Sequence, residues 1–151
     1  MQAASHENSL ISKIAVYHSS DDPTEEVAAW LTSALGEKAP GIDVKPQMQG
    51  SCLGSKMHQA MTVEARTAGR LIIIGSDCPS LTPSILAKAT QALDGGMDVV
   101  LGPADDGGFY LLGLTSEALE RSGKALFEGT EWSTSQVLSQ TLSKAELCKM
   151  R

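Results

Sequence analysis

The stretch that decides the fold is residues 71–83, which read LIIIGSDCPSLTP. It begins with four apolar residues, three of them β-branched, as in a strand that is buried on both faces of a sheet. Thr82 and Pro83 are the residue types that begin a helix, a capping side chain followed by a proline. The stretch therefore predicts a buried strand, a short loop and a helix.

The loop in this stretch contains a carboxylate, Asp77, between Gly75 and Pro79. Two interpretations are open. In the first, Asp77 or Ser76 bonds the free backbone amides of the turn, as aspartate often does. In the second, Gly75 lets the backbone approach a ligand closely, and Asp77 supplies the hard oxygen atoms that Mg²⁺ prefers when it also holds phosphates. Taken alone, the loop favours the structural interpretation.

Strand and helix patterns alternate along the rest of the chain. Strands are predicted at 13–18, 42–45 and 98–101, and helices at 23–35, 53–68 and 83–93. A further strand at 109–114 follows the strand at 98–101 too soon for a helical crossover, so these two are antiparallel or separated in the sheet. The alternation predicts an α/β fold: a three-layer α/β/α sandwich with a mixed, mostly parallel sheet.

Ligands of such sheets bind at the edge that is formed by the carboxyl ends of the strands. The segment Asp105-Asp106-Gly107-Gly108 follows the strand at 98–101 and is expected at this edge together with Asp77. Adjacent carboxylates repel each other unless a cation or donor is near, and the glycines allow positive φ and close approach of a substrate. The alternative is a hairpin turn, for which Asp-Gly is the strongest short signal, and which the motif alone favours.

Two other features are weaker candidates for ligand binding. The segment from Gln49 and Gly50 to Lys56 places glycines before a helix, where backbone amides bind anions, although its spacing is not that of a P-loop. Trp132 either packs onto the last helix, whose predicted N-cap is Ser133, or stacks on a base or sugar. A hydrolase that uses the Cys78 thiol is not favoured, because no histidine lies in a comparable motif.

Composition excludes several classes of function. The net charge of −6 arises from 18 acidic and 12 basic residues without a basic cluster, so no nucleic-acid partner is expected. No apolar run approaches the roughly 18 residues of a membrane span. Three widely spaced cysteines favour a reducing, cytoplasmic location without structural zinc. We expect a single domain over residues 10–151, preceded by a disordered or artificially added terminus at 1–9.

Three long motifs resemble a known family. They are IIIGSDCPSLTP (72–83), DVVLGPADDGGFYLLGL (98–114) and LFEGTEWSTSQVLSQTL (126–142), and a Gln-Gly, Leu-Gly and Lys-Met segment (49–57) precedes them. Over roughly Lys13 to Lys144 the chain is similar to the bacterial family called domain of unknown function 2064 (DUF2064), which is also described as glycosyltransferase-like or as radical-SAM/selenodomain-associated transferases. That family is similar in fold to the nucleotide-diphospho-sugar transferases of the GT-A type.

The resemblance implies a metal-dependent transferase of nucleotidyl or glycosyl groups with a nucleotide or nucleotide-sugar donor. Asp77 would hold Mg²⁺ or Mn²⁺ against the donor phosphates. Asp106 would be the catalytic residue on the acceptor side, where its carboxylate would bind a hydroxyl group, accept its proton or add a metal ligand. The conjunction of the three motifs thereby reverses the interpretation of Asp77 from structural to metal-binding. The implied substrate-binding residues are Gln49, Gly50, Lys56, Gly75, Ser76, Pro79, Asp105, Gly107, Gly108 and Trp132.

The chain departs from the family pattern at its N-terminal side. Family members usually begin with a strand and a basic loop that resembles a nucleotide-phosphate grip, and this segment is missing here. Lys56 stands where the family has arginine, which keeps the charge but loses bidentate phosphate geometry. A missing first strand leaves a sheet edge that a second subunit would cover. The alternative function is therefore a shortened, non-catalytic domain that binds a ligand or forms a homodimer through this edge.

Overall fold

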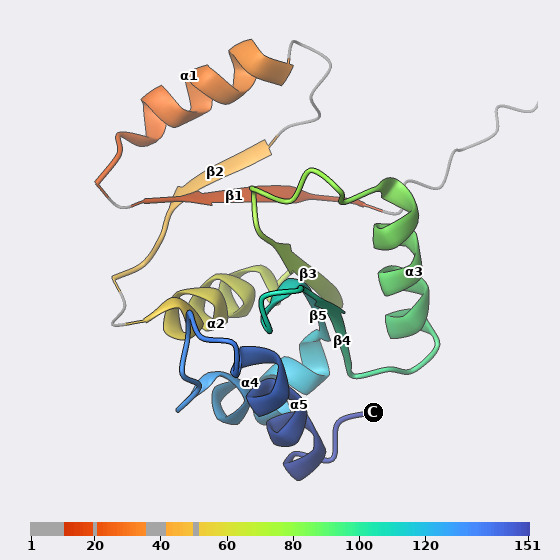
Figure 1. The fold of residues 1–151 in the computed structure, drawn as a ribbon. Helices are drawn as coiled ribbons and strands as arrows, with labels where there is room; N and C mark the ends of the chain where they lie inside the picture. Colours follow the sequence, from red (N-terminus) through yellow and green to blue (C-terminus); the bar gives the residue numbers. More distant parts are fainter. Residues whose placement is uncertain (1–10, 20, 36–41, 50–51) are drawn as a thin grey trace, which may run out of the picture. The chain divides into compact units, whose positions relative to one another are not determined.

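The computed structural model describes residues 11–19, 21–35, 42–49 and 52–151, and its fold is α/β (Figure 1). By its internal contacts the chain divides into two compact units, Met1–Gln47 and Met48–Arg151. The prediction of a single domain over residues 10–151 stays a prediction, and residues 1–9 lie outside the described part of the chain.

The first unit consists of a parallel strand pair and one helix. β1 (Ile14–His18) pairs in parallel with β2 (Ile42–Pro46), and α1 (Thr24–Leu35) lies between them in sequence. No residue of α1 is buried, and the side chain of Trp30 is 67% exposed. The apolar residues of α1 are thus exposed or only half-buried among the described residues.

The side chain of His18 stabilises the turn between β1 and α1. Its ring is buried, and Nδ1 lies 2.6 Å from the carbonyl oxygen of Ser19, so Nδ1 is the donor. In the neutral ring Nε2 then accepts from the hydroxyl of Thr24 at 3.0 Å. Both ring nitrogens are paired, which is what burial of a histidine requires.

The second unit is built on a three-stranded sheet of order β3-β5-β4. β3 (Arg70–Ile74) and β4 (Val99–Pro103) both pair antiparallel with the central strand β5 (Phe109–Thr115). Near their carboxyl ends, both edge strands pair with Leu111 of β5. They therefore run in the same direction and end at the same edge of the sheet, which is called the carboxyl edge below.

This pairing differs from the predicted fold in one respect. One strand pair among the described residues is parallel and two are antiparallel, so a mostly parallel sheet is not confirmed. The physical reason is the connection at 104–108, which is too short for a crossover and makes β5 turn back between its neighbours. Of the two alternatives for the strands on either side of this connection, antiparallel or separated in the sheet, the structure has the first.

Helices cover the second sheet. They are α2 (Leu53–Glu64), α3 (Pro83–Asp94), α4 (Ser116–Phe127) and α5 (Val137–Leu147). The predicted N-cap Thr82 is confirmed, because its hydroxyl accepts from the third amide of α3, and the hydroxyl of Thr115 caps α4 in the same way. No helix in the described ranges has the length and apolar character needed to cross a bilayer.

The last helix begins later than the sequence suggests. α5 starts at Val137 after the N-cap Gln136, so the prediction of Ser133 as its cap is wrong. Ser133 has a φ of +66°, in the left-handed region, whereas an N-cap residue has extended backbone angles. Residues 128–136 are thus a connecting segment between α4 and α5.

The two faces of the second sheet pack against different helices. Side chains alternate along β5: Leu112 and Leu114 point into a cluster with α2, α4 and α5, whereas a Cβ on Gly113 would contact Leu93 of α3. Figure 1 shows α3 apart from the other three helices of this unit. The buried cluster consists of Met61, Leu71, Leu112, Leu114, Leu119, Leu126, Phe127 and Ala145.

The turn between β4 and β5 requires glycine at one position. Gly107 has a φ of +85°, and a Cβ there would lie 2.2 Å from the carbonyl oxygen of Ser135. The carbonyl oxygen of Gly107 also accepts from the amide of Leu138 at 2.9 Å. The turn is therefore held directly against the residues that lead into α5.

His58 of α2 packs against α4. Its ring centroid is 5.4 Å from that of Phe127, and Nε2 lies 3.3 Å from where a Cβ on Gly123 would be. Desolvation in this contact lowers the pKa of His58 below its ordinary value of 6.5. The charge of Glu128 acts in the opposite direction, and that of Lys124 lowers the pKa slightly further.

We expect Gly107→Ala to lower the free energy of unfolding by about 2–4 kcal/mol, because the new methyl group meets Ser135 and the backbone angle is strained. Chemical denaturation measures the change. Gly69→Ala is the matched control, because a Cβ on Gly69 would have no neighbour within 4 Å. Equal stability of the two variants would contradict the tight contact.

We expect His58 to make the protein less stable in mild acid. Because its pKa is lowered in the folded state, the unfolded chain binds a proton more strongly. The free energy of unfolding should therefore fall as the pH drops through 6.5 and level off below the folded pKa of His58. Urea unfolding between about pH 8 and about pH 5 measures this slope. His58→Gln should flatten it, and an unchanged slope in that variant would show that His58 is not responsible.

Candidate functional site

Two of the predicted segments of the second unit, the loop at 75–82 and the turn at 104–108, lie at its carboxyl edge. The loop at 75–82 leaves β3 there, and the turn at 104–108 joins β4 to β5 at the same edge. The amide of Gly75 donates to the carbonyl oxygen of Tyr110 at 3.4 Å, which ties the loop to the start of β5. Because β5 separates them, β3 and β4 stand about 10 Å apart, two strand spacings.

Asp77 presents an exposed carboxylate at this edge. The cap of α3 is Thr82, and neither Asp77 nor Ser76 makes a side-chain hydrogen bond or ion pair with a described residue. The Oδ1 atom of Asp77 lies only 2.8 Å from where a Cβ on Gly75 would be, so a larger residue at 75 would crowd it. The turn does not use this carboxylate, which removes the main support for a purely structural Asp77.

The segment Asp105-Asp106-Gly107-Gly108 forms the hairpin turn that was the alternative to a site. One carboxylate oxygen of Asp106 accepts from the amide of Gly108 at 2.9 Å, and the amide of Ala104 donates to the carbonyl oxygen of Gly108 at 3.0 Å. Asp105 is exposed and makes no side-chain bond to the residues that the structure describes. A turn and a binding role are compatible here, because the turn uses one carboxylate oxygen of the four.

The structure describes only some of the predicted binding residues at the start of α2. Gln49 is exposed, and Gly50 lies outside the described residues. Lys56 is half-buried in the first turn of α2, and its ammonium group makes no ion pair within the described ranges. α2 begins beside Trp132, because a Cβ on Gly54 would lie 2.3 Å from the indole Nε1.

Trp132 is packed against other aromatic rings. Its ring centroid is 6.3 Å from that of Phe127, with an angle of 23° between the planes, and 6.3 Å from that of Phe109 at 84°. The indole Nε1 is buried and has no hydrogen-bond partner, which costs about 1–3 kcal/mol. This packing favours the structural alternative over stacking on a base or sugar.

The side chains at the carboxyl edge fit a metal ion only if a bound ligand supplies further oxygen atoms. No group of three or more His, Cys, Asp or Glu side chains in the described part of the chain is arranged to hold a metal ion. Mg²⁺ is, however, commonly bound through one or two protein carboxylates together with water and substrate phosphates. Asp77 alone, or with Asp105, fits that second arrangement.

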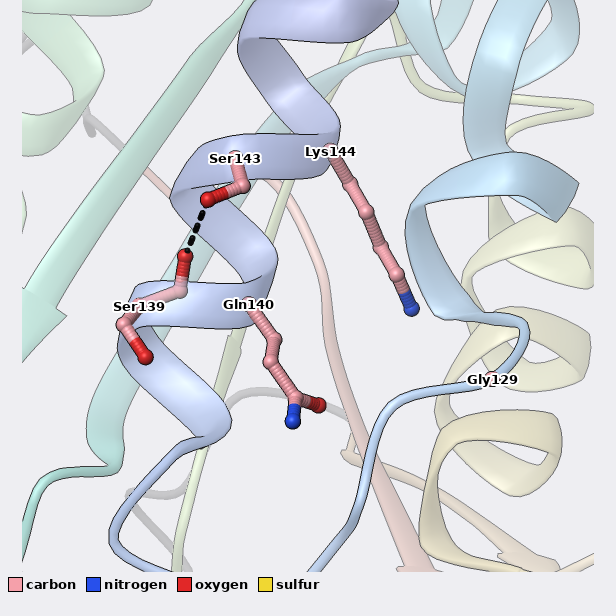
Figure 2. Close-up of a pocket in the computed structure, with 5 residues that line it drawn as sticks. All are labelled: Gly129, Ser139, Gln140, Ser143 and Lys144. Carbon is pink, nitrogen blue, oxygen red and sulfur yellow. Dashed lines mark hydrogen bonds between the residues drawn. The ribbon is translucent and has the colours of Figure 1, made fainter.

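Two surface hollows in the second unit lie away from this edge. One, of about 250 Å³, is lined by Gly129, Ser139, Gln140, Ser143 and Lys144 (Figure 2). The other, of about 410 Å³, is lined by Leu93, Gly96, Met97, Asp98, Thr115, Glu117 and Arg151. Lys144 and Gln140 bond the segment at 128–136, and Asp98 pairs with Arg121 at 3.1 Å. Because these groups are engaged, the unengaged carboxylates of the carboxyl edge are the better candidates.

Comparison with known proteins identifies the family. The family described as "Uncharacterized protein conserved in bacteria (DUF2064)" matches residues 5–134. No match to the chain was found among curated proteins. A crystal structure from Desulfovibrio desulfuricans G20, of a protein provisionally assigned as a nucleotide-diphospho-sugar transferase, matches with a TM-score of 0.73 and 25% sequence identity.

The extent of these matches differs. The structural match covers 92% of this chain and 56% of the Desulfovibrio protein, so this chain spans little more than half the length of that protein. The family match covers most of this chain and includes Asp77, Asp105 and Asp106. The resemblance found in the three motifs is thus confirmed, and the protein belongs to the DUF2064 family.

Proposed function

We propose that this protein is a metal-dependent transferase that moves a nucleotidyl or glycosyl group from a nucleotide or nucleotide-sugar donor. The observation that carries the proposal is the exposed carboxylate of Asp77, which the fold leaves without a partner among the described residues at the carboxyl edge. The similarity to the Desulfovibrio protein supports the class of donor.

On the donor side, Asp77 is the proposed ligand of Mg²⁺ or Mn²⁺. Such an ion neutralises the negative charge that develops on the leaving phosphate or nucleotide. Gly75, Ser76 and Pro79 shape the loop around Asp77, and the ammonium group of Lys56 adds positive charge for the phosphates. Most of the rate enhancement then comes from positioning donor and acceptor.

On the acceptor side, Asp106 is the proposed catalytic residue. The amide of Gly108 holds one of its carboxylate oxygens, which fixes the orientation of the group. The second oxygen then accepts a hydrogen bond, and finally the proton, from an acceptor hydroxyl group. Asp105, Gly107 and Gly108 form the wall beside it.

Two finer predictions about the whole protein belong to this proposal. The first is the three-layer α/β/α sandwich with a mixed, mostly parallel sheet. The packing of α3 opposite the other helices of the second unit supports the layers, and not the strand directions. The second is a cytoplasmic location, which accords with three cysteines that form no disulfide.

The second candidate function is a shortened, non-catalytic domain that binds a ligand or forms a homodimer. One observation favours it: the described residues contain no cluster of three metal-ligating side chains. A domain of this kind would not need the Asp77 carboxylate for binding.

Titration calorimetry with nucleoside diphosphates, nucleoside triphosphates and nucleotide sugars, with and without Mn²⁺, separates the two functions. We expect at least one of these compounds to bind only with Mn²⁺, and Asp77→Asn to weaken that binding about tenfold or more, because the variant removes a charged ligand. Glu120→Gln, which removes an exposed charge from α4, is the matched control. Binding that survives unchanged in Asp77→Asn would favour the non-catalytic domain.

We further expect Mn²⁺ without nucleotide to bind weakly, with a Kd above about 1 mM, because the edge supplies too few oxygen ligands of its own. Electron paramagnetic resonance of free Mn²⁺ measures this directly. A nucleotide-independent Mn²⁺ site of micromolar affinity would be inconsistent with the proposed division of ligands between protein and donor.

A further inference from the structure

The segment at 128–136, between α4 and α5, is fastened to α5 by two side chains of that helix. The ammonium group of Lys144 donates to the carbonyl oxygen of Glu128 and, at 2.6 Å, to the hydroxyl of Thr130. Gln140 accepts from the amide of Glu131 at 2.9 Å and donates to its carboxylate at 3.0 Å. Figure 2 shows both side chains extending from α5 toward the connection that contains Gly129. These hydrogen bonds therefore hold the segment against α5.

The same segment contacts the turn that contains Asp106. Its residue Ser135 lies so close to Gly107 that a Cβ there would be 2.2 Å from the Ser135 carbonyl oxygen. Just beyond the segment, the amide of Leu138 donates to the carbonyl oxygen of Gly107 at 2.9 Å. The position of the turn is thus set by backbone contacts rather than by flexible side chains.

On its other side the segment contacts the first turn of α2 through Trp132. A Cβ on Gly54 would lie 2.3, 2.4 and 2.5 Å from the Nε1, Cε2 and Cζ2 atoms of the indole. The same ring packs on Phe127, the last residue of α4, and on Phe109, the first residue of β5. One side chain therefore joins the start of α2 to the strand that leaves the turn at 104–108.

We propose that residues 128–136 support the turn at 104–108, and that Trp132 is the positioning residue that couples this turn to the start of α2. The inference rests on the proposed function, because its functional consequence is that the coupling keeps Asp106 and Lys56 at a fixed separation. It also accounts for a glycine in the first turn of α2, where any side chain would meet the indole.

The test uses the full chain without nucleotide, so that its outcome does not depend on transferase activity. The readout is amide hydrogen exchange, measured by NMR, at Gly107, Gly108 and Leu138, whose N–H groups bond within or against the turn. Gly54→Ala places a methyl group where the indole lies. We expect exchange at these three amides to accelerate about tenfold or more, and exchange in β3 to change less than about twofold.

A second variant tests whether the effect passes through the indole. Trp132→Ala removes the whole ring, including the Nε1, Cε2 and Cζ2 atoms that abut Gly54. Relative to Trp132→Ala alone, adding Gly54→Ala should therefore leave the three turn amides unchanged, because the methyl group now has room. Gly69→Ala and Trp30→Ala are the matched controls, since one position is open and the other side chain is mostly exposed.

Three outcomes would overturn the coupling. They are unchanged turn amides in Gly54→Ala, equal acceleration at the turn and in β3, and the same acceleration by Gly54→Ala whether residue 132 is Trp or Ala. The calorimetric titration with Mn²⁺ and nucleotides decides the proposed function separately. If no nucleotide binds while the exchange results hold, the transferase proposal fails and the support of the turn stands as a structural property.

Discussion

The five-residue connection at 104–108 is the constraint on which the second unit depends. It is too short for a helical crossover, so β5 pairs antiparallel with β4 and takes the central place beside β3. The carboxyl ends of β3 and β4 are thereby brought to one edge, and Asp77 and Asp105-Asp106 with them. Gly107 makes the connection feasible, because its positive φ and lack of a side chain allow contact with Ser135.

The carboxylates at this edge differ in their contacts with the rest of the fold. Asp106 is oriented by the amide of Gly108, whereas Asp77 and Asp105 are exposed without a side-chain partner among the described residues. A carboxylate that stabilises no turn or helix contributes little to folding, which leaves Asp77 available for the ligand role proposed for it. The oriented and the unengaged carboxylates suit different tasks, proton acceptance and metal binding.

Three motifs that are far apart in sequence meet around one indole ring. Gly54 precedes Lys56 in the first turn of α2, Phe109 follows the turn of Asp106, and Phe127 ends α4, and all three contact Trp132. A ring in such a position resists displacement, because moving it would disturb three packed elements at once. The tryptophan is thus part of the framework of the candidate site, although its sequence context equally suggested an aromatic surface for a ligand.

Local patterns in the sequence determined the elements and the family. The apolar run before Gly75 and the caps Thr82 and Thr115 follow from short-range rules of backbone geometry and capping, and the structure has them. The short connection before β5 excluded a helical crossover, and the structure decided for antiparallel pairing. The strand order, the start of α5 after Ser133 and the packing of Trp132 depend on contacts between distant residues, which no local pattern encodes. Whether Asp77 served the turn was likewise decided only in three dimensions, because a hydrogen bond needs its donor in place before a carboxylate can be said to use it.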